Sequence, residues 1–205
     1  MTQRKAIFWE VDTQADFMLP GGSLYVPGAE KTLPNLKRLV DAARQGRVLL
    51  VSDACRHTPD DPEFKTFPPH CIRGTPGARI VPEGLADTHA DVPNDPGFKL
   101  PNDLFSKQQI VIEKQTLDVF DNPLTDQIVN RLEKDAEYFV FGVVTEYCVR
   151  LAAKGLLARG RKVSLVKDAI EALNPVQGRQ AIEELQSLGA RLVTTDQALA
   201  AVESA

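Results

Sequence analysis

The chain has 205 residues, of which 43% are hydrophobic and 25% charged, and this length and composition suit one domain with a single core. The formal net charge is −4 and charges of both signs are interspersed, which gives no basis for nucleic acid or an anionic membrane surface as a partner. No apolar stretch approaches the roughly 20 residues of a membrane span, and the N-terminus carries no signal-peptide pattern. We therefore expect a single cytoplasmic domain over residues 1–205.

Six short segments rich in β-branched or aromatic residues are predicted to be strands. Several of them, such as AIFWEV, VLLVS and YFVFGVV, are apolar almost throughout, which is typical of strands buried on both faces of a parallel sheet. In chain order the predicted strands are Lys5–Asp12, Arg47–Asp53, Gln108–Lys114, Glu137–Val144, Lys162–Asp168 and Ala190–Thr194.

Helical patterns lie between most of these strands. In the first of them, leucines recur at helical spacing and Gly46 follows where a helix end is expected. Because strands and helices alternate, the fold class is predicted to be α/β, with a mostly parallel sheet and right-handed crossovers. The predicted helices are Glu30–Gln45, Asn122–Lys134, Thr145–Arg159, Pro175–Leu188 and Asp196–Val202.

One long segment, Ala54–Lys107, has little periodicity of either kind. It holds nine of the fourteen prolines and all three histidines of the chain. A loop of this length in a compact domain is usually functional or disordered, and its aromatic, histidine and cysteine content favours an ordered excursion beside a site. We call this segment the excursion.

Chemically useful side chains stand at the carboxyl ends of four predicted strands. The first strand ends in Asp12, the second in Asp53 and the third in Lys114, and the fourth runs into Cys148. Singly, each has an ordinary interpretation as a cap, an ion-pair partner or a core thiol. Ligands bind beyond the carboxyl ends of the strands in open α/β sheets, so their joint placement predicts an active site at this edge.

The position of Cys148 favours a nucleophile. It lies just after a strand, near the start of a predicted helix, where the helix dipole and a nearby Lys114 are expected to lower the thiol pKa. Asp12 could then accept the thiol proton and return it to a leaving amine. Backbone N–H groups at the turn could bind the oxyanion.

Four segments in order along the chain resemble nicotinamidases and the wider isochorismatase-like cysteine hydrolases. They are VDTQADFMLPGGSLYVPGAE at 11–30, FPPHCIRGTPGARIVP at 67–82, IEKQTLDVF at 112–120 and FGVVTEYCVRLAAKGLLARGRKVSLVKDA at 141–169. The resemblance covers most of the chain. It implies a three-layer α/β sandwich with a six-stranded, mostly parallel sheet between helices.

The resemblance also implies roles for individual residues. Asp12, Lys114 and Cys148 fall on the catalytic triad. Val143-Val144 falls on a non-prolyl cis peptide, which directs the N–H groups of Val144 and Cys148 at the oxyanion. The aromatic residues expected to wall the amide pocket are Phe17, Phe67 and Tyr147.

The activity implied is hydrolysis of the C–N bond of a small amide through a cysteine thioester. Nicotinamide, giving nicotinate and ammonia, is the first expectation, and ureido, carbamoyl or maleamic amides are the alternatives. In the second case Arg56, Arg73 or Lys99 of the excursion could bind a substrate carboxylate. Isochorismatase activity itself is disfavoured, because it acts on a vinyl ether by acid catalysis and needs no thiol.

Nicotinamidases hold a metal beside the pocket, and this sequence departs from their ligand pattern. Asp53 and His70 fall on two of the ligand positions, whereas the other two carry Cys55 and Asp61, with His57 displaced in register. One divalent ion (Zn, Fe or Mn) bound by Asp53, His70 and one of Cys55, His57 or Asp61 is one expectation. Loss of the metal is the other, since many relatives work without one. No organic cofactor is expected.

Two other functions remain open at this stage. One is a family member that has lost catalysis and binds a small amide or a protein, although an intact triad argues against it. The other is a thiol-redox or metal-binding protein using Cys55, Cys71 and Cys148, but these cysteines form no C-x-x-C pair and read as free thiols. The resemblance further implies a homo-oligomer, a common state of such relatives.

Overall fold

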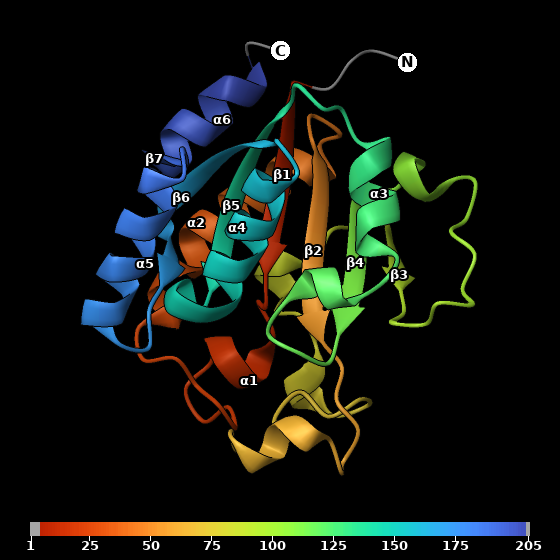
Figure 1. Ribbon diagram of the computed structural model, residues 1–205, viewed down its shortest axis with the longest axis vertical. Helices are drawn as coiled ribbons and strands as arrows, with labels where there is room; N and C mark the ends of the chain where they lie inside the picture. The colour runs from red at the N-terminus through yellow and green to blue at the C-terminus, as the bar shows by residue number, and fades with distance from the viewer. Residues whose placement is uncertain (1–4, 204–205) are drawn as a thin grey trace.

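The computed structural model describes residues 5–203 and is built on a single sheet of seven strands (Figure 1). The strand order is β3-β4-β2-β1-β5-β6-β7, and every neighbouring pair is parallel. The strands are β1 (Ala6–Val11), β2 (Leu49–Cys55), β3 (His89–Val92), β4 (Gln109–Lys114), β5 (Glu137–Val143), β6 (Lys162–Glu171) and β7 (Arg191–Val193).

The prediction of six strands is wrong by one. All six are present within a few residues of their predicted bounds, and β3 is the strand that the sequence did not reveal. It has four residues, HADV, at the edge of the sheet beside β4, and only Val92 is buried. A short, mostly exposed edge strand needs no apolar run, so periodicity gives no signal for it.

Helices cover both faces of the sheet and make the three layers that were predicted. On one face α2 packs against α6, and both contact β6; on the other α4 packs against α5 and β6. The short α1 lies at the carboxyl end of the strands (Figure 1). The helices are α1 (Ala15–Met18), α2 (Leu33–Arg44), α3 (Thr125–Arg131), α4 (Arg150–Ala158), α5 (Pro175–Ser187) and α6 (Thr195–Glu203).

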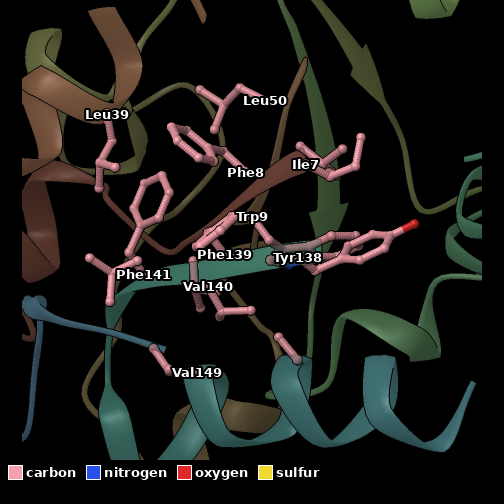
Figure 2. Packing of buried hydrophobic residues seen from close by; sticks show 14 of the residues in the cluster. Ile7, Phe8, Trp9, Leu39, Leu50, Tyr138, Phe139, Val140, Phe141 and Val149 are labelled. Atoms are coloured by element: carbon pink, nitrogen blue, oxygen red, sulfur yellow. The ribbon is translucent and has the colours of Figure 1, made fainter. Parts of the chain in front are cut away.

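Aromatic side chains fill the core on both sides of the central strands. Phe8 of β1 packs edge to face against Phe139 and Phe141 of β5, with ring centroids 5.7 and 5.9 Å apart. The next residue, Trp9, points to the opposite face and stacks on Phe120 at 6.2 Å. Figure 2 shows Phe8 and Phe141 gathered with Leu39 of α2 on one side of β5. This burial on both faces explains why these strands read as continuous apolar runs.

The excursion is ordered and hydrogen-bonded to the sheet. The Gln14 side chain donates to the carbonyl of Cys55 at 2.7 Å and accepts from its N–H at 3.0 Å. Arg73 forms a bidentate ion pair with Glu113 of β4, at 3.0 and 2.7 Å. The excursion thus closes over the carboxyl ends of β1, β2 and β4 (Figure 1).

Between residues 5 and 203, no helix is both long and apolar enough to cross a membrane.

A buried carboxyl group, Glu10, lies beneath this edge of the sheet. It accepts hydrogen bonds from Thr13 Oγ1 at 2.7 Å, Ser52 Oγ at 2.5 Å and Gln109 Nε2 at 3.0 Å. Gln109 Nε2 also donates to the carbonyl of Gly84, which joins the cluster to the excursion. Burial raises the pKa of Glu10 to about 7, and the three hydrogen bonds oppose that rise.

The raised pKa predicts a specific pH dependence of stability. The folded protein holds the Glu10 proton up to about pH 7, whereas the unfolded chain releases it near the ordinary value of 4.5. The free energy of unfolding therefore falls by about 3 kcal/mol as the pH rises from 4.5 to above 7. In Glu10→Gln the fall between pH 5 and pH 8, measured by urea titration, should be smaller than in the native sequence by about 2–3 kcal/mol, and the part due to other buried acids should remain. Exposed Glu183→Gln should retain the full fall. An equal fall in Glu10→Gln and the native sequence would refute the assignment.

Candidate active site

Lys114 is the centre of the site at the carboxyl edge of the sheet. Its Nζ lies 2.7 Å from Asp12 Oδ2 and 3.6 Å from Asp53 Oδ1, and all three side chains are buried. They come from the adjacent strand ends β4, β1 and β2, so the predicted convergence is present. Burial by itself lowers the pKa of Lys114, but the facing anionic groups, Asp12 first, outweigh it and raise that pKa well above its usual range. The side chain is therefore an ammonium ion.

Asp53 supports Lys114 from the other side. Its Oδ2 accepts a hydrogen bond from Trp9 Nε1 at 3.0 Å, while its Oδ1 faces the ammonium group. Burial raises the pKa of Asp53 to about 8, against the opposing effect of Lys114. Asp53 is thus held by the indole and the ammonium groups.

Cys148 lies in the first turn after β5, where residues Thr145–Val149 form a π-helical turn that leads into α4. It lines a cavity that Asp12 also lines. Burial raises the pKa of the Cys148 thiol well above its usual range, Lys114 opposes the rise, and Asp12 adds to it. The expectation of a lowered pKa is wrong, because the loss of hydration outweighs the ammonium group. Cys148 therefore rests as a thiol, and a role as nucleophile would need a base.

The peptide bond between Val143 and Val144 is cis, as the resemblance implied. Val144 and Cys148 both line the cavity. Their backbone N–H groups remain the predicted oxyanion donors.

The cavity brings together the three aromatic residues expected at the pocket. Phe17, Phe67 and Tyr147 all line it, and the rings of Phe67 and Tyr147 meet edge to face at 6.1 Å. Sequence reasoning missed other lining residues. Leu24, Val26 and Leu117 lie within the segments that carry the family resemblance, and this position was the only sequence signal for them. Glu63 and Leu173 lie outside those segments, and no sequence signal pointed to them. The missed residues are Leu24, Val26, Glu63, Leu117 and Leu173.

The cationic residues considered for carboxylate binding lie elsewhere. Arg73 is paired with Glu113, and Arg56 donates to the carbonyls of Cys55 and Ala78. Lys99 is exposed in the loop after β3. Among the lining side chains that the structure describes there is no arginine or lysine, so no cationic side chain of the cavity wall can bind a substrate carboxylate.

Three metal-ligating side chains converge beside the cavity. The ligand atoms of Cys55, His57 and His70 lie within 4.8 Å of one another, and all three residues are buried. Of the three alternatives for a third ligand, Cys55 and His57 therefore both join His70. Asp53 lies outside this group, and Asp61 stands behind it, with Oδ2 2.9 Å from His57 Nδ1.

The group fits a divalent metal ion. Within residues 5–203, His57 Nε2 is buried and has no hydrogen-bond partner, which is costly for a polar atom unless something binds it. His70 Nδ1 is paired with the carbonyl of Pro68 at 2.8 Å, so its Nε2 is the nitrogen left for a ligand. Burial lowers the pKa of His70, which favours the neutral, ligating form. One sulfur and two imidazole nitrogens, each ring oriented by an oxygen, are a donor set that suits zinc.

The chain is similar in sequence and fold to nicotinamidases and pyrazinamidases. The chain is 25% identical over 207 residues to the nicotinamidase of Escherichia coli K12, covering 90% of this chain and 92% of that protein. It is 27% identical over 189 residues to the nicotinamidase/pyrazinamidase of Mycobacterium tuberculosis, covering 89% and 95%. The zinc complex of the Pyrococcus horikoshii pyrazinamidase superposes with a TM-score of 0.74 at 27% identity, covering 93% of this chain and 99% of that one.

The model of the isochorismatase domain matches residues 7–93 and 83–197. These two ranges span most of the chain and include every residue of the triad, the cavity and the Cys55, His57 and His70 group. The protein therefore belongs to the isochorismatase family of hydrolases, among its nicotinamidase-related members.

Proposed function

We propose that this protein hydrolyses a small, neutral aromatic amide of the nicotinamide type to a carboxylic acid and ammonia. The observation that carries the proposal is that the Asp12 carboxylate, paired with the Lys114 ammonium at 2.7 Å, lines the same apolar cavity as the Cys148 thiol. A nucleophile, a base and a fixed positive charge are the groups that acyl transfer requires.

The first half of the reaction forms a thioester. Asp12 takes the proton of the Cys148 thiol as the sulfur attacks the amide carbonyl, and the carbonyl oxygen becomes an oxyanion beside the backbone N–H groups of Val144 and Cys148. When the C–N bond breaks, Asp12 gives its proton to the nitrogen and ammonia leaves. Because the resting thiol holds its proton, this transfer is coupled to the attack.

The second half restores the enzyme. Asp12 takes a proton from water, and the hydroxyl oxygen attacks the thioester carbonyl. The C–S bond breaks, the sulfur regains the proton from Asp12, and the carboxylic acid departs. Lys114 remains charged throughout and stabilises the negative charge, which moves between Asp12 and the sulfur.

The cavity supports a neutral and apolar substrate. Its wall is made mainly of aliphatic and aromatic side chains, and Glu63 is placed where it would repel an anion. Maleamic and N-carbamoyl amino acids carry a carboxylate, for which the wall offers no lysine or arginine. The names of the relatives from Escherichia coli and Mycobacterium tuberculosis agree with an uncharged aromatic amide.

We further propose that Cys55, His57 and His70 hold one zinc ion. Cys55 and His70 also line the cavity, so the ion would lie at its wall. When bound there it would offer a Lewis-acidic contact to a lone pair of the substrate. The chain's own residues supply the remaining positioning, since Phe17, Phe67 and Tyr147 enclose a flat ring.

Ammonia release from a panel of amides tests the activity. We expect release from nicotinamide and pyrazinamide, little from maleamate or N-carbamoyl amino acids, and a loss of kcat on the order of 10³-fold or more in Cys148→Ala. The matched control is Cys71→Ala, which removes a buried thiol that does not line the cavity. Equal turnover by Cys148→Ala would exclude the mechanism, and release from an anionic amide alone would overturn the substrate class.

Cobalt binding tests the metal ligands without reference to turnover. Protein stripped of metal and titrated with Co²⁺ should develop a near-ultraviolet sulfur-to-cobalt charge-transfer band, because a thiolate is among the ligands. The band should persist in Cys148→Ala and Cys71→Ala and disappear in Cys55→Ala. His57→Ala and His70→Ala should each weaken binding by about tenfold or more. A band retained in Cys55→Ala, or no uptake of cobalt, would contradict the assignment.

A further inference from the structure

We propose that Asp16 is a positioning residue that holds two walls of the substrate cavity in register through a single carboxylate. The inference rests on the proposed function, since it concerns the cavity of that site. Asp16 itself does not line the cavity and is 8% exposed. It belongs to α1, one residue before Phe17, which does line it.

Each oxygen of the carboxylate accepts a backbone N–H from a different segment. Oδ1 accepts from Ser23 at 3.0 Å, and Oδ2 accepts from Cys71 at 2.7 Å. The first segment follows α1 and the second belongs to the excursion, 48 residues further along the chain by residue number (71 − 23). The Asp16 side chain thus joins the loop after α1 to the excursion.

The segment on the Ser23 side forms one wall. The N–H of Leu24 donates to the carbonyl of Asp16 at 3.2 Å, and the N–H of Val26 donates to the carbonyl of Phe17 at 2.9 Å. Leu24, Val26 and Phe17 all line the cavity. The position of this wall therefore depends on the bonds that fold the chain back onto Asp16.

The segment on the Cys71 side forms the wall that carries His70. Cys71 has a positive φ of 46°, a conformation that a side chain makes unfavourable and that surrounding bonds must hold. Its N–H is held by Asp16, and its carbonyl accepts the N–H of His57 at 3.1 Å. Since His70 immediately precedes Cys71, the same contacts set where the His70 ring lies against Phe17, at 5.2 Å between centroids.

Two glycines make room for this arrangement. A Cβ on Gly77 would lie 2.2 Å from Asp16 Oδ1, and a Cβ on Gly22 would lie 2.3 Å from the Asp16 carbonyl oxygen. Both distances are far shorter than a van der Waals contact. The excursion and the loop after α1 therefore pack directly on Asp16, which leaves no space for a longer acid.

Asparagine is the informative substitution. It keeps the shape of the side chain but has one oxygen and one NH₂ group, so it can accept only one of the two N–H groups. The other N–H then faces the NH₂ group and loses its partner; the bond to Cys71 is buried and the bond to Ser23 is part-buried. The triad should be unaffected, because Asp12 and Lys114 are held by the sheet and Cys148 by the turn after β5.

The experiment combines hydrogen exchange with kinetics on full-length protein. In Asp16→Asn we expect amide protection to fall by about tenfold or more in residues 19–26 and 66–77, with the sheet unchanged. For nicotinamide, KM should rise by about tenfold or more while kcat stays within about threefold. Gly77→Ala displaces the same carboxylate without changing a charge and should give the same pattern. Asp95→Asn is the matched control, since that exposed carboxylate also accepts a backbone N–H, from Gly97.

The outcomes separate this inference from the proposed function. Protection lost uniformly over the sheet, or a KM equal to that of the native sequence, would show Asp16 to be an ordinary structural residue and would overturn the inference. Local loss of protection in a protein that hydrolyses no amide would uphold the placement of the two walls by Asp16 and reject the proposed function alone.

Discussion

A buried ammonium ion sets the terms for the rest of this structure. Lys114 lies among groups with almost no exposure to water, and a charge in such a place is tolerated only when it is paired and hydrogen-bonded. Its partners Asp12 and Asp53 come from the next two strands, so β4, β2 and β1 must end at the same level. The register of the three parallel strands and the pairing of Asp12, Asp53 and Lys114 therefore depend on each other. The same arrangement places Asp12 and Lys114 where they act on the pKa of Cys148.

Most of the sheet could be predicted from sequence because burial on both faces imposes apolar runs on β1, β2, β4 and β5. The edge strand β3 escaped because its side chains are largely exposed. The observed bounds of two helices differ from the predicted ones. The start of the first predicted helix is a 3₁₀ turn at Ala29–Thr32, and the turn between β5 and α4 is π-helical. Hydrophobic periodicity reports which face is buried and carries no information on how tightly a turn is wound.

Some residues of the site could likewise be placed from the sequence, and others could not. Asp12, Lys114 and Cys148 could be brought together from sequence because strand ends converge by topology alone. His57 could not be placed, because its position depends on a parallel bridge with Ile72 that joins two parts of the excursion. The pKa of Cys148 was predicted in the wrong direction for a related reason. Chain order shows the helix start and the lysine, whereas the loss of hydration that dominates appears only when the surrounding segments close over the thiol.

The origin of the cavity walls has an evolutionary consequence. The proposed triad lies in β4, directly after β1 and in the turn after β5. The cavity residues Glu63, Phe67 and His70 lie in the excursion, and Leu24 and Val26 lie in the loop after α1. Substitutions in the loops can reshape the cavity while the sheet keeps Asp12 and Lys114 in place. The residues that shape the cavity and the residues held by the sheet therefore lie in different parts of the chain and can change independently. A fold of this kind allows the walls of a site to change while the residues at the strand ends stay the same.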